Sequence, residues 1–165
     1  MDFWRMGLTG LLGITAGMMI AGCSPSEEEM LSKSGYQQVG DLEESTVWVA
    51  QEPDDSGKYG IHVAGKLRGF CKGSVIAGIG EQICNMGEEA RGSLYMVGAP
   101  AAAVAGTITL TNGKIVHAQT FALPGHPDMK LAIGTSASSH AKGFVDVEFA
   151  TANGVLLDRS GNQKQ

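Results

Sequence analysis

Histidines are the first residues in this chain whose chemistry could serve a metal site or a general base, and there are four: His62, His117, His126 and His140. A loop histidine close to an aspartate can be held in one tautomer and made basic, and His126 lies two residues before Asp128. The serines that follow lie in no Gly-x-Ser-x-Gly elbow: Ser136, Ser138 and Ser139. His117 and His126 are the candidate ligands of a metal site.

Paired acids are the next candidates, because glycosidases use two facing carboxylates and calcium loops use alternating oxygens closed by a glutamate. Asp54-Asp55, Glu88-Glu89 and Asp146 with Glu148 fit neither pattern, and acidic turns and an exposed strand face explain them. Gly78-Ile79-Gly80 lacks the Gly-x-Gly-x-x-Gly register of a dinucleotide site. We therefore expect a protein that is not an enzyme, with no catalytic residues and no cofactor.

Residues 1–22 have the layout of a secretory signal. A short polar start with Asp2 and Arg5 precedes an uncharged run over 6–22. This run is shorter than the roughly 20 apolar residues that a membrane-spanning helix needs, and glycines interrupt it. The segment is therefore expected to direct export.

The signal segment ends in Ile20-Ala21-Gly22-Cys23. These residues resemble the lipobox of bacterial lipoproteins, in which an aliphatic residue and two small ones precede the cysteine that receives a diacylglyceryl group. The resemblance covers the N-terminus alone, and Ile20 stands where the family most often has leucine. It implies cleavage before Cys23 and lipidation of Cys23. The alternative is an ordinary signal peptide, because small residues before the cleavage site suit that peptidase as well.

The resemblance also implies an address. Mature members carry more than one acyl chain, such as palmitate, and each buried methylene contributes about 0.8 kcal/mol, so the anchor holds firmly. In this family an aspartate directly after the lipidated cysteine commonly retains the protein at the inner membrane. Ser24 occupies that position here. We therefore expect an outer-membrane protein at the periplasmic face.

Two cysteines remain beyond the anchor, Cys71 and Cys84, an even number for an oxidising compartment. We predict a disulfide between them, which closes a loop of about 14 residues and stabilises the fold by about 3 kcal/mol on the chain-entropy model. Zinc or a reactive thiol is the alternative. Zinc sites need further ligands nearby, and neither cysteine has a cysteine or histidine within a few residues.

Removing the first 22 of the 165 residues leaves 143, the size of one ordinary domain. The chain has 17 acidic against 12 basic residues, so no basic stripe is available for nucleic acid. Residues 23–44 are predicted to form a polar, lipidated tether. Ser26 and Glu29 fit a capping box that could begin a short helix over 27–33, but few apolar residues follow to dock it.

The segment 45–160 has short β-branched and aromatic runs separated by glycines, and it predicts an all-β domain. Strands are expected at 46–50, 58–64, 74–79, 93–97, 107–111, 114–121, 129–133, 144–149 and 155–157. These candidates suggest a small antiparallel sandwich or barrel of about seven or eight strands, of which we favour the sandwich. The polar end, 161–165, is expected to fray.

Two Asn-Gly pairs predict hairpin turns. Asn112-Gly113 lies between alternating flanks and suits a type I′ turn, which needs positive φ at both central residues. Asn153-Gly154 offers a second turn. In the strand before it, alternation places Phe144 on the face of the two acids and puts Val145, Val147 and Phe149 on the buried face.

These observations predict a noncatalytic envelope lipoprotein. The acyl chains would hold it in the membrane, and the β-domain would bind another envelope protein through a sheet edge or loops. Components of secretion or conjugation assemblies, envelope-integrity factors and inhibitor or immunity proteins share this layout. The alternative is a periplasmic lipoprotein that binds a small ligand or metal, with His117 and His126 within ligand distance or a pocket of a few hundred Å³.

Overall fold

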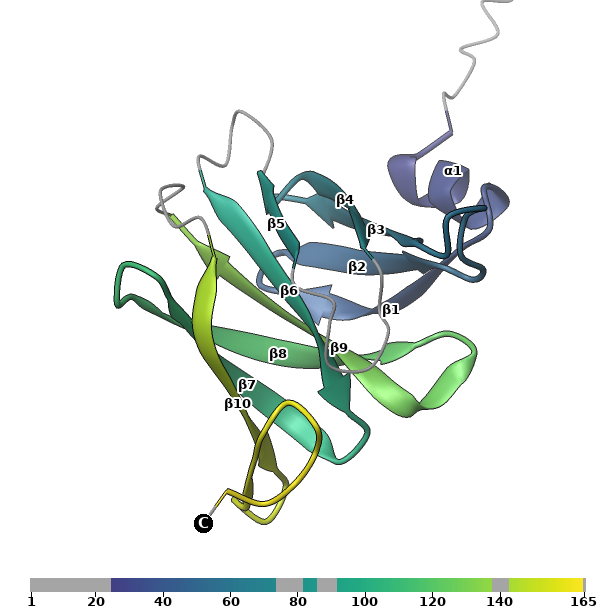
Figure 1. Cartoon of the computed structure of the whole chain (residues 1–165). Helices are drawn as coiled ribbons and strands as arrows, with labels where there is room; N and C mark the ends of the chain where they lie inside the picture. Colours follow the sequence, from purple (N-terminus) through teal and green to yellow (C-terminus); the bar gives the residue numbers. More distant parts are fainter. Residues whose placement is uncertain (1–24, 74–81, 86–91, 138–142, 165) are drawn as a thin grey trace, which may run out of the picture.

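Figure 1 shows the computed structural model of the chain, which describes residues 25–73, 82–85, 92–137 and 143–164, with the backbone alone for 82–85. One short helix precedes eleven strands within these ranges, and the strands form two antiparallel sheets. The prediction of an all-β protein is confirmed, and the two packed sheets agree with a sandwich. No helix in the described ranges is long and apolar enough to cross a membrane.

The smaller sheet is a four-stranded antiparallel meander. Its strands follow chain order: β1 (Tyr36–Leu42), β2 (Ser45–Ala50), β3 (Tyr59–Gly65) and β4 (Gly69–Gly73). Helix α1 (Glu27–Lys33) lies against this sheet, at the opposite end of the molecule from the C-terminus in Figure 1. The sequence pattern did not predict β4, because it is short and a glycine stands at each end.

The larger sheet has seven strands and curls on itself. Its order is β11 (Leu156–Leu157), β10 (Phe144–Thr151), β7 (Ala103–Leu110), β8 (Ile115–Leu123), β9 (His126–Ser136), β6 (Ser93–Pro100) and β5 (Gln82–Asn85). Three strands separate β10 from β6 in this order, yet the rings of Phe144 and Tyr95 lie 5.8 Å apart because the curl brings the two strands face to face. The short β5 was not predicted, and the strand expected at 74–79 lies outside the described residues.

The larger sheet is buried on both faces at its centre. One face packs on the smaller sheet, where Leu94, Met96 and Ile133 meet Val47, Ile61 and other apolar residues in a first core. The opposite face lines the inside of the curl, where Tyr95, Val97 and Ala132 meet Ile108, Phe149 and others in a second core. Alternate residues of β6 and β9 therefore enter different cores. This explains why β6 is a continuous apolar run in the sequence.

The predicted hairpin between β7 and β8 is confirmed, but its turn is not type I′. Only Gly113 has a positive φ, of 79°, and Asn112 does not. Gly113 N–H donates to the Leu110 carbonyl at 2.9 Å, and Leu110 N–H donates to the Lys114 carbonyl at 2.8 Å. This is the longer loop in which a type I turn is followed by one left-handed glycine. The second predicted hairpin, at Asn153-Gly154, forms in the same way between β10 and β11.

A β-bulge corrects the predicted faces of β10. Phe144 pairs with Leu110 and Asp146 with Thr109, so Val145 is an extra residue in the ladder. Phe144 therefore packs against the second core beside Val147 and Phe149, whereas Val145 is 66% exposed. Strict alternation placed these two residues wrongly, because a bulge shifts the period by one residue.

The predicted tether is largely part of the domain. The Ser26 Oγ accepts from Glu29 N–H at 3.1 Å and caps α1, and Leu31 packs on Trp48 and Ala64. Residues 36–42 form β1, which pairs with β2. A tether seemed adequate because this stretch has few apolar residues. Two buried leucines, Leu31 and Leu42, and the backbone ladder with β2 are enough to dock it.

The predicted frayed end is also ordered as far as residue 164. Leu157 bridges to Gln163, and Lys164 Nζ donates to Glu148 Oε1 at 2.6 Å and to Asp146 Oδ2 at 3.1 Å. The hydrogen bond from Lys164 lowers the pKa of Asp146, and the two carboxylates raise the pKa of Lys164. Polar residues were expected to fray, but here they bond to the outer side of β10.

We predict that Gly134→Ala weakens the fold strongly. A Cβ at Gly134, in the middle of β9, would lie 2.7 Å from the His117 carbonyl oxygen and 2.6 Å from Val116 Cγ1. Because a backbone atom blocks it, the free energy of unfolding should fall by about 2 to 3 kcal/mol in urea titration. Gly143→Ala is the control, since its Cβ would meet only Thr111 Cγ2 at 3.5 Å. Equal effects of the two substitutions would contradict this account.

Candidate functional site

The strand register keeps the two histidine candidates for a metal site far apart. Ala118 of β8 pairs with Gly134 of β9, so His117 lies level with Thr135, nine residues along β9 from His126. At about 3.3 Å per residue, that places them roughly 30 Å apart. His126 instead shares a hydrogen bond of 2.8 Å with the Tyr59 hydroxyl. The described residues contain no group of three His, Cys, Asp or Glu that could hold a metal ion, and His140 lies outside them.

The cysteines lie on two neighbouring strands. Cys71 of β4 is buried in the first core opposite Ile61. Cys84 of β5 pairs through its backbone with Leu94 of β6, and β4 contacts β5. The side chain of Cys84 and the whole of Cys23 lie outside the described residues. The disulfide and the lipidation site therefore remain predictions.

Aromatic side chains form a row across the outer face of the smaller sheet. Trp48 of β2 pairs with His62 of β3, and His62 pairs with Phe70 of β4. Their neighbours along each strand, such as Val47 and Ile61, point into the first core, so the row points outward. Period-2 alternation indicated that each residue shares a face with its second neighbour. Only the register brings residues from three strands into one row.

Tyr36 of β1 extends this aromatic surface. Its ring meets the His62 ring edge-on with centroids 5.9 Å apart, and the His62 and Phe70 centroids lie 5.1 Å apart. The Tyr36 hydroxyl lies where a side chain at position 60 would begin, so a larger residue at Gly60 would have to displace the end of the Tyr36 side chain. The ring therefore lies across β3 and forms one wall of the surface.

Helix α1 covers part of the row and leaves a hollow beside it. Leu31 closes over Trp48 and Ala64, while the Trp48 indole donates to Thr46 Oγ1 at 2.9 Å. Between the helix and the sheet lies a hollow of about 310 Å³, which we call the apolar hollow. Its lining residues are Glu27, Met30, Leu31, Ser34, Tyr36 and His62. Met30, which lines the hollow, is 50% exposed. Phe70, beside His62 at the end of the row and outside the lining of the hollow, is 47% exposed.

One polar atom beneath this surface is unsatisfied. The Nδ1 of His62 is buried and has no hydrogen-bond partner among the described residues. Leaving such a group unpaired costs about 1 to 3 kcal/mol. A phenylalanine would fill the same place between Tyr36 and Phe70 without this penalty. The histidine therefore costs stability at this site.

A second hollow, of about 380 Å³, lies on the other side of the helix N-terminus and is strongly acidic. We call it the acidic hollow, and five of its lining residues carry carboxylates: Glu27, Glu28, Asp41, Glu43 and Glu44. Glu43 has a positive φ of 54° in the turn between β1 and β2, and its Oε1 accepts from Thr135 Oγ1 at 2.9 Å. Lys66 pairs with Glu44 at 2.6 Å, which raises the pKa of Lys66. Glu27 lines both hollows, so the two are neighbours on the surface.

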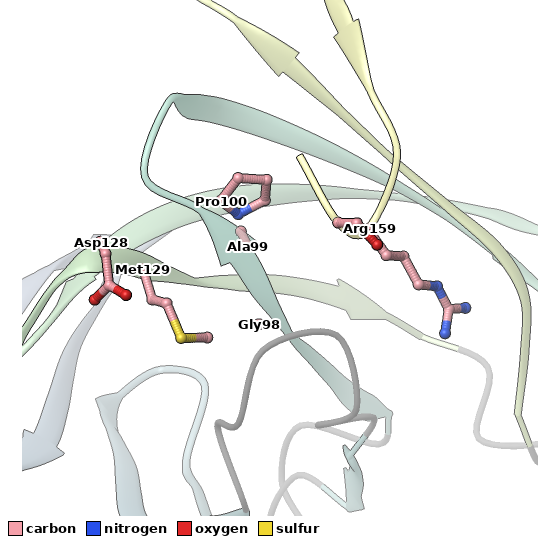
Figure 2. A pocket seen from close by; sticks show the side chains of 7 residues that line it. Gly98, Ala99, Pro100, Asp128, Met129 and Arg159 are labelled. Carbon is pink, nitrogen blue, oxygen red and sulfur yellow. The ribbon is translucent and has the colours of Figure 1, made fainter. Parts of the chain in front are cut away.

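A third hollow lies at the far end of the larger sheet, as Figure 2 shows. It measures about 280 Å³ and is lined by Gly98, Ala99, Pro100, Asp128, Met129, Arg159 and Ser160. Asp128 and Arg159 stand on opposite sides, and their charged groups do not converge on a common point. Ligand sites usually exceed 300 Å³ and contain converging polar groups. This hollow is therefore the poorer candidate.

Comparison with known proteins assigns no family. No protein-family model, curated protein or solved structure matches this chain. A function can thus be inferred only from the features of the structure itself. These are the apolar hollow, the aromatic row and the neighbouring acidic hollow.

We predict that Cys71 and Cys84 are joined in the exported protein. Digestion without reduction should release one cross-linked species that contains both residues, and reduction should separate it. The Cys71→Ala/Cys84→Ala variant should lose about 3 kcal/mol of unfolding free energy. Cys23→Ser is the control and should keep the cross-link. Alkylation of both thiols in unreduced protein would refute the pairing.

We predict that His62→Phe stabilises the fold. Removing the buried unpaired Nδ1 should raise the free energy of unfolding by about 1 kcal/mol, measured by urea titration. His117→Phe is the control, because His117 is exposed on β8, and it should change little. A loss of stability in His62→Phe alone would show that the imidazole is satisfied in the folded protein.

Proposed function

We propose that this protein is a membrane-anchored envelope lipoprotein that binds another protein and catalyses no reaction. The observation that supports this most is the apolar hollow with its exposed Met30, together with the exposed Phe70 beside His62 at the end of the aromatic row. Exposed apolar side chains gathered on one face are typical of interaction sites, and aromatic residues and methionine are enriched at the centres of interfaces. The unsatisfied nitrogen of His62 supports a binding role, because a buried polar atom without a partner costs stability and calls for another explanation.

The proposed contact uses the face of the smaller sheet in place of the sheet edges first expected. Both edge strands of the smaller sheet already have neighbours. At β1, the Asp41 carbonyl accepts from Gln119 Nε2 of β8 at 3.1 Å, and β4 lies beside β5. Strand β11 has two residues, and beside it β10 has a bulge and the ion pairs of Lys164. Short, bulged and charged edges resist strand addition.

The expected anchor would place this face close to the membrane. Cys23 precedes the helix-capping Ser26 by three residues, which span at most about 11 Å. A diacylated Cys23 would therefore hold α1 and the neighbouring aromatic row near the lipid headgroups. We place the protein at the periplasmic face of the outer membrane, where a membrane protein or membrane-bound assembly is the natural partner. Secretion or conjugation assemblies, envelope-integrity complexes and inhibitor or immunity pairs all meet this description.

A small apolar ligand is the second candidate for the same site. The apolar hollow, at about 310 Å³, falls at the lower limit for small-molecule pockets, and Met30, Leu31 and Tyr36 form its apolar walls. A protein side chain fits the same space. The exposed Phe70 outside the hollow favours the protein, because a ligand confined to the hollow would leave that ring in water.

The test is a pull-down from detergent-solubilised envelopes of the producing cells, with the native protein as bait. One envelope protein should be recovered in stoichiometric amount. The Met30→Glu/Phe70→Glu variant should reduce this recovery at least about tenfold, because charges replace the two exposed apolar side chains. Purified bait and partner should then bind with the same dependence.

Two controls separate the site from the anchor. Val145→Glu changes an equally apolar, more exposed residue on β10 and should leave recovery unchanged. Cys23→Ser should move the protein from the membrane to the soluble fraction. Equal recovery by the bait and by its Met30→Glu/Phe70→Glu variant would refute binding at this face.

A further inference from the structure

We propose that the partner presents a basic, apolar segment, with an apolar side chain in the apolar hollow and neighbouring lysine or arginine side chains on the acidic hollow. This inference rests on the proposed function and adds the chemistry of the partner. It also assigns to Glu27, Glu28 and Glu43 a role in binding that chemistry.

The two hollows can accept one continuous segment. Glu27, the first residue of α1, lines both, and Ala64, which lies under Leu31 in the apolar cluster, also lines the acidic hollow. A segment that follows the helix N-terminus would thus pass from Met30 and Tyr36 to the carboxylates without leaving the surface. An extended chain covers about 3.3 Å per residue, so a few residues suffice to contact both.

The carboxylates of the acidic hollow are poorly neutralised within the chain. Lys66 pairs with Glu44, and Lys33 pairs with Glu29 outside this hollow, each at 2.6 Å. Across the described residues, Glu27, Glu28 and Glu43 form no ion pair. Carboxylates without partner cations attract lysine and arginine, and arginine can bond to a carboxylate through two donors.

The same charges disfavour the other possible occupants. A second copy would bring two acidic hollows together, and the chain as a whole has a net charge of −5. An anionic membrane surface would be repelled for the same reason. A basic segment is attracted, and its apolar residue can use the flexible side chain of Met30 and the rings of Tyr36 and His62.

The test uses the full-length lipidated protein in detergent as bait for a displayed library of random peptides about ten residues long, enough to span both hollows. Selected peptides should be enriched in lysine and arginine next to Phe, Leu, Ile, Met or Trp. A synthetic peptide from the selection should bind more weakly as salt is raised. Absence of enrichment, or enrichment in acidic residues, would overturn the proposal.

Matched variants assign the contacts. Glu27→Gln/Glu28→Gln/Glu43→Gln should weaken the selected peptide about tenfold, because three carboxylates are lost while side-chain size is kept. Glu52→Gln/Asp55→Asn/Asp128→Asn makes the same change in charge at exposed positions elsewhere and should leave affinity unchanged. Equal weakening by both variants would mean a general charge effect and would refute a role for the acidic hollow.

Two further outcomes separate this inference from the function on which it rests. If the envelope partner depends on Phe70 but binds the Glu27→Gln/Glu28→Gln/Glu43→Gln variant normally, the proposed function stands and the basic segment is refuted. If the Cys23→Ser protein binds vesicles of phosphatidylethanolamine and phosphatidylglycerol through Met30 and Phe70, the face is a membrane contact and both proposals fall. We expect no such binding.

Discussion

The burial of β6 and β9 on both faces is the constraint on which the rest of this fold depends. Alternate side chains of these strands enter two cores, with Leu94 and Met96 on one side and Tyr95 and Val97 on the other. One flat sheet cannot shield both faces of its own strands. The first face is covered by the smaller sheet, and the second is covered because β7 and β10 curl round toward β6.

The curl requires close approaches that only small residues allow. Gly134 leaves room for the backbone of β8. A Cβ at Gly106 would lie 3.2 Å from the ring of Phe149, so a larger residue there would push the ring by a few tenths of an ångström. On the smaller sheet, Gly60 accommodates Tyr36 in the same way. Part of the high glycine content, 24 residues, is thus explained by packing between neighbouring strands and rings.

This architecture also determines which surface remains for binding. The inner face of the smaller sheet packs in the first core. Its edge strands β1 and β4 already contact the larger sheet, and the edge near β10 carries the ion pairs of Lys164. The outer face of the smaller sheet is left, and a helix of seven residues covers only part of it. An apolar surface therefore lies beside acidic turns, at the end of the chain where the lipid anchor is expected.

Local features of this protein can be predicted from the sequence. The residues predict the all-β class and both Asn-Gly hairpins, because each depends on residues adjacent or nearly adjacent in the chain. They also offer Ser26 as a candidate helix cap, although a tether was the preferred interpretation there. The sequence pattern missed the bulge at Val145, because an inserted residue leaves no mark in a period-2 pattern. It took 36–42 for a tether, because β1 gains its place from pairing with β2 and has few apolar residues of its own.

The residues of the candidate site come together only through the tertiary fold. Trp48, His62 and Phe70 are separated in sequence by more than a strand length, and the register of three strands aligns them. The same kind of register separates His117 from His126, the two candidate ligands of a metal site. Alternation along a strand tells which face a residue occupies, but it carries no information on which residue lies beside it on the next strand. That neighbour is fixed by long-range packing, and so the aromatic row and the hollow beside it can be found only in the folded chain.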